Sequence, residues 1–294
     1  GTNSSSENPQ YVFDDCGTYN VSLTVTDDNG CTHDTTIIVE VYCEPEANFT
    51  YQAACVGDTT FFTDASTTDS GVVVIEWIWD MGGSGTYVLG TTPSSQNPVF
   101  IYDDCGTYNV TLTIVDNHFC SDDTTIMVEV YCLPAPNFSA TTECEGDTTI
   151  FTDLSQAGSN PSAPIVAWSW NMGGSGTYVN GTNSSSENPQ YVFDDCGLHS
   201  VSLTVTDDNG CTHDTTIIVE VYCNPTAIFT APALCFDNQP MIFTSTSNDG
   251  TGTINQWSWN MGGSGTYVSG TNSSSENPQY VFDDCGTYNV SLTV

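Results

Sequence analysis

The sequence predicts an all-β protein made of tandem β-sandwich domains of roughly 90 residues, each cross-linked by disulfides. Three observations support this. The segment Tyr-Val-Phe-Asp-Asp-Cys-Gly starts at residues 11, 191 and 280, and a variant of it starts at residue 100. Its cysteines, Cys16, Cys105, Cys196 and Cys285, are 89, 91 and 89 residues apart. Apolar and polar residues alternate after each copy, as in half-buried strands.

The strands of one unit can be placed in order. Early strands are expected around Phe138, over residues 149–152 and over residues 165–170, where β-branched and aromatic residues gather. The last two strands are clearer, because apolar residues alternate over residues 108–114 and a second run covers residues 124–130. No segment has a helical period of apolar residues.

A tight turn joins these last two strands. In the first copy it contains Asn29-Gly30, a strong signal for a short hairpin. The second copy has Asn117, His118 and Phe119 there, so a turn of different shape is expected.

Linkers and spacings divide the chain into four repeats. Pro45, Pro134 and Pro225 each follow a cysteine by two residues and mark short, stiff linkers. Residues 1–43 are predicted to be the C-terminal part of a domain, residues 44–132 and 133–223 whole domains, and residues 224–294 a domain without its last strand. Residues 270–294 repeat residues 1–25 identically. We interpret this as a three-domain super-repeat from a longer polymer, the alternative being a subunit whose incomplete ends fit those of its neighbours.

Charge and cysteine content narrow the function. The chain has no Lys or Arg, 36 Asp plus Glu and a formal net charge of −36. Binding to nucleic acids or anionic membranes depends on cations, so neither is expected. Membrane insertion is not expected either, because no apolar run is long enough. Divalent cations, glycans and further copies of the chain remain candidate partners. Thirteen cysteines at regular spacing indicate an extracellular or cell-surface protein.

One motif resembles a known domain. The run Trp77-Ile78-Trp79-Asp80-Met81-Gly82-Gly83 recurs at residues 168–174 and 257–263, and residues 106–113 follow in matching order. These residues resemble the PKD domain, the immunoglobulin-like module named for the polycystic kidney disease protein and common in bacterial surface proteins. The resemblance covers essentially the whole chain, although Asn171 and Asn260 replace the family's usual aspartate. It implies a seven-strand immunoglobulin-like sandwich used as a spacer or adhesive module.

The cysteines are expected to form disulfides within each repeat, where four cysteines allow three pairings. Cys105 and Cys132 lie symmetrically about the turn near residue 118, so they should face each other at the open end of the hairpin. The same arithmetic predicts the bonds Cys16–Cys43 and Cys196–Cys223.

The remaining pairs follow less directly. Cys55–Cys120 and Cys144–Cys211 are the favoured bonds, and Cys43–Cys120 is the competing one, because a simple sandwich places the start of its second strand far from the turn. Cys235 is then expected to bond to Cys31 of the next unit, and Cys285 has no partner in this scheme.

No catalytic site is predicted. The Trp-x-Trp pairs could stack on sugars but suit a sandwich core better. The Gly-Gly-Ser-Gly run has no P-loop lysine and is interpreted as a turn. His33, His118, His199 and His213 have no metal-ligand spacing and no recurring nucleophile. We therefore expect that the chain has no enzymatic activity and that it binds no cofactor other than calcium.

Two kinds of surface site remain. Acidic pairs that are expected in the turns offer oxygen ligands for a weak calcium site: Asp27, Asp28, Asp122, Asp123, Asp207 and Asp208. Eight asparagines lie in Asn-x-Ser/Thr triplets and are candidate glycosylation sites: Asn3, Asn20, Asn48, Asn109, Asn137, Asn183, Asn272 and Asn289.

The sequence thus predicts a structural repeat protein that forms an extracellular filament, sheath or stalk. The alternative is an adhesin or glycan-binding module carried on such a stalk, with its site in the most variable stretch of each repeat: residues 64–75, 153–166 and 245–255.

Overall fold

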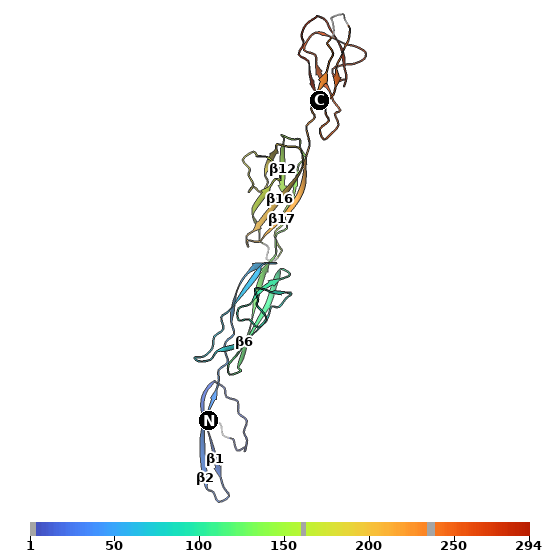
Figure 1. Ribbon diagram of the computed structural model, residues 1–294. Coiled ribbons are helices and arrows are strands. Elements are labelled where there is room, and N and C mark those ends of the chain that lie inside the picture. The colour runs from blue at the N-terminus through green and yellow to red at the C-terminus, as the bar shows by residue number, and fades with distance from the viewer. Residues whose placement is uncertain (1–3, 160–162, 234–238) are drawn as a thin grey trace. The chain divides into compact units, whose positions relative to one another are not determined.

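The structure of the chain is a computed structural model that describes residues 4–159, 163–233 and 239–294 (Figure 1). All regular elements in these ranges are β-strands. No helix in the described residues is long and apolar enough to cross a membrane. The chain forms two compact units: Gly1–Leu133 with Gly158–Ala163, and Pro134–Ala157 with Pro164–Val294.

In the first unit, the second repeat is a sandwich of two four-stranded sheets. The strands of each sheet pair antiparallel, except that β4 pairs parallel with β10. The sheets are β3(Phe49–Gln52)-β5(Thr59–Asp64)-β8(Val99–Tyr102)-β7(Gly85–Tyr87) and β4(Ala54–Cys55)-β10(Ser121–Tyr131)-β9(Gly106–Asp116)-β6(Val74–Asp80).

The core of this repeat lies between the two sheets. Alternate residues point inward, so Val110, Leu112 and Ile114 on β9 are fully buried while the residues between them are not. Successive side chains along a strand point to opposite faces of the sheet, which explains the alternation of apolar and polar residues in the sequence. The inward residues pack on aromatic rings of the other sheet, including Phe49, Phe62 and Tyr102.

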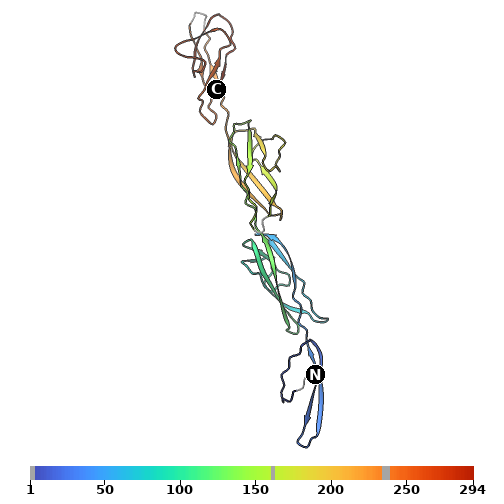
Figure 2. The same ribbon diagram turned by 180° about the vertical axis from the view of Figure 1, so that it is seen from behind.

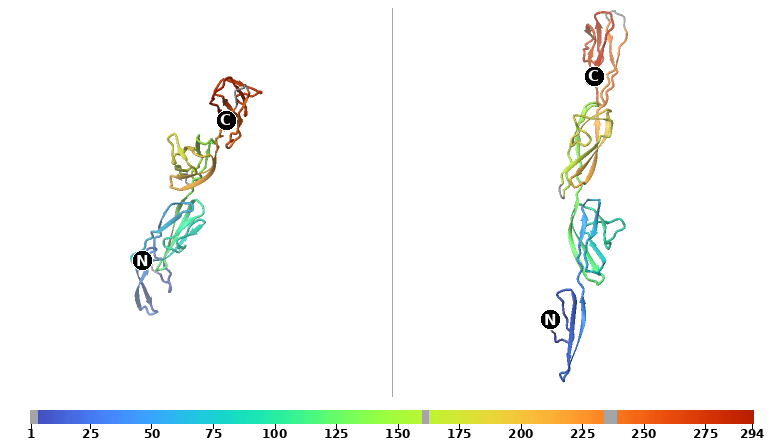
Figure 3. Two further views of the ribbon diagram at one scale, coloured as in Figure 1. Left: turned by 45° about the horizontal axis from the view of Figure 1, so that its top comes forward. Right: turned by 90° about the vertical axis from the view of Figure 1, so that its left-hand side faces the viewer.

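The first repeat contributes one long hairpin to this unit. Its strands β1 (Gly17–Thr26) and β2 (Thr32–Val41) pair antiparallel over their whole length, from Gly17 opposite Val41 to Thr26 opposite Thr32 (blue in Figures 2 and 3).

In the second unit, the third repeat has nearly the same arrangement as the second. Phe151, Val201, Leu203 and Val205 are fully buried in its core. Its sheets are β11(Phe138–Ala140)-β12(Thr148–Asp153)-β15(Gln190–Phe193)-β14(Gly176–Tyr178) and β13(Ile165–Asn171)-β16(Gly197–Asp207)-β17(Thr212–Val221).

The fourth repeat belongs to the same unit and has shorter strands. Its core contains Phe243, Trp259, Met261 and Tyr280. The strand pairings are β18(Phe229–Thr230)-β20(Thr244–Ser245), β19(Met241–Ile242)-β23(Gln279–Phe282)-β22(Gly265–Tyr267) and β21(Ser258–Asn260)-β24(Ser291–Thr293).

A tyrosine holds the corner that leads into β9. The Tyr108 hydroxyl donates to the carbonyl oxygen of Asp104 at 2.7 Å, an arrangement typical of immunoglobulin-like sandwiches. In the third repeat His199 takes this place, with Nε2 at 3.0 Å from the carbonyl oxygen of Asp195. The histidine keeps both the ring stacking and the polar contact, because it stacks on Phe193 as Tyr108 stacks on Tyr102.

The close approach of the chain before β7 requires glycine. A Cβ on Gly82 would lie 2.3 Å from the carbonyl oxygen of Asn109, and Gly82 has a φ of 68°. The Gly-Gly-Ser-Gly run is therefore a turn packed against β9.

The hairpin turn of the second repeat has the same shape as the Asn-Gly turns, so the prediction of a different shape is wrong. Phe119 has a φ of 66°, in the same left-handed region as Gly30 at 85° and Gly210 at 84°. The N–H of Phe119 donates to the carbonyl oxygen of Asp116 at 3.0 Å, and Gly30 and Gly210 make the equivalent bond. The preceding aspartate explains this, because Asp116 Oδ1 also accepts the N–H groups of His118 and Cys120.

Candidate functional site: disulfides and exposed faces of the repeats

Three disulfides close the open ends of the long hairpins. They are Cys16–Cys43, Cys105–Cys132 and Cys196–Cys223, each with a sequence separation of 27 residues. In each case the cysteines flank the last residue pair of the hairpin, such as Gly106 opposite Val130. These are the three bonds that the symmetry about the turn predicts.

The predicted bond Cys55–Cys120 is wrong, because Cys120 is a free thiol. Cys55 lies on β4 opposite Tyr131, at one end of β10, whereas Cys120 precedes the first residue of β10. An 11-residue strand separates them, which corresponds to about 35 Å at about 3.3 Å per residue. The competing bond Cys43–Cys120 is also absent, because Cys43 is bonded to Cys16.

The third repeat repeats this result. Cys144 is a free thiol, so the predicted bond Cys144–Cys211 does not form. The backbone of Cys144 forms an isolated parallel β-bridge with Tyr222, the residue that follows β17, whereas Cys211 precedes the start of that strand. Cys235 lies outside the described residues. Its predicted partner Cys31 is an exposed free thiol, as is Cys285.

The tryptophan pairs form part of the core. Trp79 is buried, and its indole Nε1 donates to the carbonyl oxygen of Ser95 at 2.9 Å. Trp77 packs at the edge of the core and donates from Nε1 to Asp64 Oδ2 at 2.8 Å. Asp64 also accepts hydrogen bonds from Ser66 and Gln96. Partial burial raises the pKa of Asp64, but these hydrogen bonds outweigh it and lower the pKa below its ordinary value.

The acidic residues proposed as calcium ligands mostly serve local structure. The turn aspartate Asp27 accepts the N–H groups of Asn29 and Cys31 on Oδ1, and the bond from Cys31 lowers its pKa. Asp207 makes the equivalent bonds. Asp122 Oδ2 accepts the N–H of Ala47 at 2.8 Å. Asp28, Asp123 and Asp208 are exposed.

Only one group of three metal-ligand atoms within 4.8 Å of one another occurs in the described ranges: Cys16, Cys43 and Asp69. Its two sulfurs are joined in a disulfide. The six acids are therefore not gathered into a three-ligand site where the structure describes the chain.

Asp116 is a structural residue that was not among the residues predicted to matter. Its carboxylate is fully buried, and Oδ2 has no hydrogen-bond partner while Oδ1 holds the turn. The signal was present, because an aspartate stands at this point before the turn in each of the first three repeats.

The glycosylation triplets fall into two groups. Asn20 and Asn109 are exposed on β1 and β9, and Asn289 is exposed in the fourth repeat. Four others use their side-chain oxygens to accept a nearby backbone N–H: Asn48, Asn137, Asn183 and Asn272. Asn3 lies outside the described residues.

The histidines do not converge on one site. His118 stacks on Tyr42 at 3.6 Å, and His213 Nδ1 lies 3.1 Å from the carbonyl oxygen of Pro134. His199 holds the corner described above, and His33 is exposed on β2.

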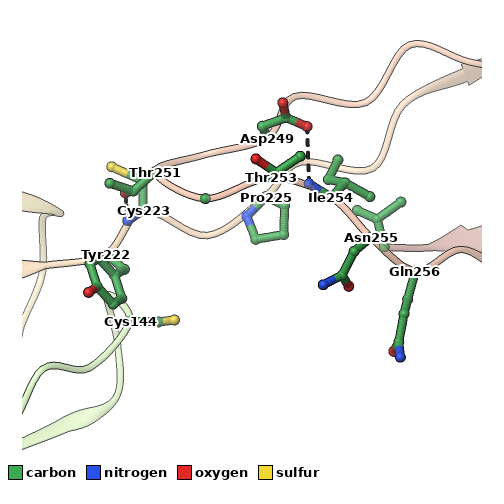
Figure 4. A pocket seen from close by; sticks show the side chains of 12 residues that line it. Cys144, Tyr222, Cys223, Pro225, Asp249, Thr251, Thr253, Ile254, Asn255 and Gln256 are labelled. Atoms are coloured by element: carbon green, nitrogen blue, oxygen red, sulfur yellow. Dashed lines mark hydrogen bonds between the residues drawn. The ribbon is translucent and has the colours of Figure 1, made fainter.

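A cavity of about 480 Å³ opens in the second unit (Figure 4). The variable stretch of the fourth repeat supplies half of the lining residues, and the N–H of Ile254 donates to Asp249 Oδ1 at 3.3 Å there. Cys144 and Tyr222 also line the cavity.

The hairpin of the first repeat has an exposed apolar face. Val21, Leu23 and Val25 on β1 are 42%, 56% and 56% exposed. The equivalent residues of the second and third repeats are fully buried.

Comparison with known proteins identifies one family model along the chain. The model, described as the PKD domain, matches residues 1–41, 42–130, 133–221 and 222–294. Only residues 131 and 132 are left unmatched.

Several solved structures are similar to parts of this chain. The PKD1 domain of Vibrio anguillarum Epp is 31% identical, with 30% of this chain and 93% of that chain covered and a TM-score of 0.24. Fibronectin(III)-like modules of Clostridium thermocellum CbhA are 14% identical, with coverages of 60% and 95% and a TM-score of 0.29. Three N-terminal domains of the bacteriophage RB49 outer capsid protein Hoc are 9% identical, with coverages of 79% and 78% and a TM-score of 0.33.

Proposed function

Because the chain belongs to the PKD domain family along nearly its whole length, we propose that it is a load-bearing segment of an extracellular stalk, sheath or filament. Tandem domains of this family suggest an extracellular structural or adhesion-type module, and the disulfides agree with an oxidising compartment. PKD domains are generally not catalytic, and we propose no enzymatic activity for this chain.

The observation that carries the proposal is the position of the hairpin disulfides. Cys43, Cys132 and Cys223 are the residues at which the chain leaves one repeat for the next, two residues before a proline. A pull on the linker after Cys132 therefore reaches Cys105 through the disulfide. Cys105 directly precedes β9, which lies between β10 and β6. The hairpin from Cys105 to Cys132 then carries no load and cannot be drawn out.

Pulling single molecules with an atomic force microscope tests this function. While the disulfide is intact, the chain between its two cysteines, which are 27 residues apart, cannot extend. At about 3.5 Å per residue, we expect each intact second repeat to release about 95 Å less chain on unfolding than its reduced form. The double variant Cys105→Ser/Cys132→Ser should release the longer length without reductant. Equal lengths with and without reductant would contradict the proposal.

Adhesion is a second candidate, supported by the cavity in the variable stretch of the fourth repeat. Such a pocket suits a small ligand such as a glycan residue. We expect binding on a glycan array that is lost in Asp249→Trp, a change that fills the cavity. Binding unaffected by this change would place any adhesive site elsewhere.

We also propose that the exposed asparagines Asn20, Asn109 and Asn289 carry N-linked glycans, because all three residues are accessible to solvent. The asparagines whose side chains already accept backbone N–H groups are less suited. Intact-glycopeptide mass spectrometry of the native protein should find modification at the first group and not at Asn48 or Asn137.

A further inference from the structure

The variable stretch of each repeat pairs with the linker through which the chain enters that repeat. One residue of the stretch and one of the linker exchange two backbone hydrogen bonds of 2.8 to 3.0 Å. The pairs are Thr67 with Glu46, Gln156 with Ala135, and Asn248 with Thr226. The linker residue always stands three positions after the cysteine that closes the preceding hairpin. The contact is therefore constant, although the stretch differs in sequence and length from repeat to repeat.

Two residues further on, the stretch of the third repeat reaches the hairpin disulfide of the second repeat. The backbone comes so close that a Cβ on Gly158 would lie 2.3 Å from the carbonyl oxygen of Cys132. The hydroxyl of the next residue, Ser159, donates to Cys132 Sγ at 3.7 Å. Cys132, which is bonded to Cys105, is only 7% exposed.

The fourth and second repeats make the equivalent contact. A Cβ on Gly250 would lie 2.3 Å from the carbonyl oxygen of Cys223. Thr251 Oγ1 accepts the N–H of Cys223, and the N–H of Thr251 donates to the Cys223 carbonyl oxygen at 3.3 Å. In the second repeat Asp69 takes this place, and its carboxylate lies within 4.8 Å of both sulfurs of the hairpin disulfide of the first repeat. Each of these contacts lies inside one of the two compact units.

The last hairpin of the second and third repeats also contacts the entering linker. In the second repeat, Asp122 Oδ2 accepts the N–H of Ala47 at 2.8 Å. In the third repeat the place of Ala47 is taken by Pro136, which has no N–H. His213, at the place of Asp122, instead lies with Nδ1 at 3.1 Å from the carbonyl oxygen of Pro134. The side chain and the linker thus change together, and the linker proline is buried in both repeats.

We propose that residues 67–69, 156–159 and 248–251 form a clamp in each repeat that holds the end of the preceding repeat and shields its hairpin disulfide from reductants. The partner of this surface is the segment from the second hairpin cysteine to the residue after the linker proline. This proposal rests on the function proposed above, because load passes through the hairpin disulfides only while they are intact.

The shielding follows from how disulfides are reduced. Reduction begins when a thiolate attacks one sulfur, so its rate depends on access to the sulfurs. Gly158 and Ser159 lie against Cys132, so a reductant reaches this cysteine only after the clamp opens. Opening breaks the two backbone hydrogen bonds to Ala135, and these contacts keep the open form rare. In the second repeat the Asp69 carboxylate also repels an anionic thiolate.

The reduction rates of the individual disulfides test the clamp. The purified chain, with its free thiols first alkylated, is exposed to dithiothreitol for increasing times. Newly formed thiols are then labelled and counted by mass spectrometry for each hairpin disulfide. Because a clamp covers the disulfide of the preceding repeat, a change in the third repeat should act on the Cys105–Cys132 bond. The Cys196–Cys223 bond, which belongs to the third repeat itself, should keep its rate.

Gly158→Ala tests the close approach. The new Cβ cannot remain 2.3 Å from the Cys132 carbonyl oxygen, so the clamp must move away, and we expect the Cys105–Cys132 bond to be reduced several-fold faster. Gly252→Ala is the matched control, because a Cβ there meets nothing within 4 Å, and it should leave every rate unchanged.

Two results would overturn the clamp. One is an unchanged rate at Cys105–Cys132 in Gly158→Ala. The other is an equal acceleration at Cys196–Cys223, which would show that the stability of the fold protects the disulfides and that the local contact does not.

Thr251→Val tests the same contact in the fourth repeat. Valine has nearly the shape of threonine but cannot accept the N–H of Cys223. We expect the Cys196–Cys223 bond to be reduced about fivefold faster, the effect of one lost hydrogen bond, while Cys105–Cys132 keeps its rate. Thr251→Ser retains the hydroxyl and should retain the rate of the unchanged chain. A serine variant as fast as the valine variant would refute the role of this hydrogen bond and with it the clamp.

The clamp and the load-bearing function fail independently in these experiments. If the reduction rates do not respond but the hairpin disulfides still shorten the chain released on pulling, the load-bearing function stands and only the clamp is overturned.

Discussion

At the scale of single residues, the repeats differ in how they satisfy one indole group. Trp77 and Trp168 each donate from Nε1 to an aspartate, Asp64 or Asp153, at 2.8 Å. In the fourth repeat Ser245 stands at the place of these aspartates, and the buried Nε1 of Trp257 has no partner. An unpaired buried donor costs stability, so a single substitution accounts for part of the difference between the repeats.

Restoring this acceptor should stabilise the fourth repeat. We expect Ser245→Asp to raise its free energy of unfolding by about 1 kcal/mol, because the carboxylate reaches the indole N–H. Urea unfolding followed by tryptophan fluorescence measures the change. Thr244→Asp adds the same charge at an exposed neighbouring position and should give no gain. Equal effects of the two changes would contradict the explanation.

The Asp64 carboxylate makes the second repeat sensitive to acid. Its pKa is lowered in the folded state relative to the ordinary value of 3.8, so folding favours the charged form. This stabilisation is fully present above the unfolded-state pKa and is lost as the pH falls through the folded-state pKa.

We therefore expect the stability difference between the wild type and Asp64→Asn to shrink steadily as the pH falls from about 5 to about 2. Urea unfolding at several pH values measures it. Trp77→Phe removes one donor to the carboxylate and should reduce the pH dependence. A difference that stays constant with pH would show that the hydrogen bonds do not favour the charged carboxylate.

At the scale of elements, the long hairpin is the unit that recurs most faithfully. Its turn keeps one shape in three repeats because the aspartate before it accepts two backbone N–H groups. The shape needs a residue in the left-handed region, which Gly30 and Gly210 adopt at little cost. Phe119 adopts it as well, with its ring 82% exposed, so nothing in the packing of the ring offsets the strain.

Phe119→Gly should therefore stabilise the second repeat by about 1 kcal/mol, through relief of the Cβ strain. Phe119→Ala removes the ring but keeps Cβ and should leave the stability nearly unchanged. Chemical unfolding of the three proteins measures both effects. If alanine stabilises as much as glycine, the ring and not the backbone is responsible.

At the scale of the whole molecule, the formal net charge of −36 acts without any Lys or Arg to offset it. Stability must come from apolar burial, strand pairing and disulfides, and the carboxylates repel one another at low ionic strength. The protein therefore suits a medium that contains salt.

We expect the melting temperature to rise by several degrees between about 10 mM and about 150 mM NaCl, as the screening length falls from about 30 Å to about 8 Å. Differential scanning calorimetry measures this. Calcium and magnesium should act equally at equal concentration if they only screen charge, and a chelator that lowers the melting temperature in calcium but not in magnesium would reveal a specific site. No dependence on salt would mean that the charges are already solvated.

The sequence by itself determined the features that depend on local spacing. The alternation over residues 108–114 indicated which side chains of β9 point into the core, because strand geometry has a period of two. The symmetry of Cys105 and Cys132 about one turn predicted their bond for a similar reason, since the register of a hairpin follows from its turn.

Only the tertiary structure decided what depends on the order of strands in the sheet. The short strand β4 lies parallel to β10 and meets its far end, so Cys55 and Cys120 are separated by the full length of that strand. No local pattern in the sequence encodes this, because Cys55 and Tyr131 are distant along the chain.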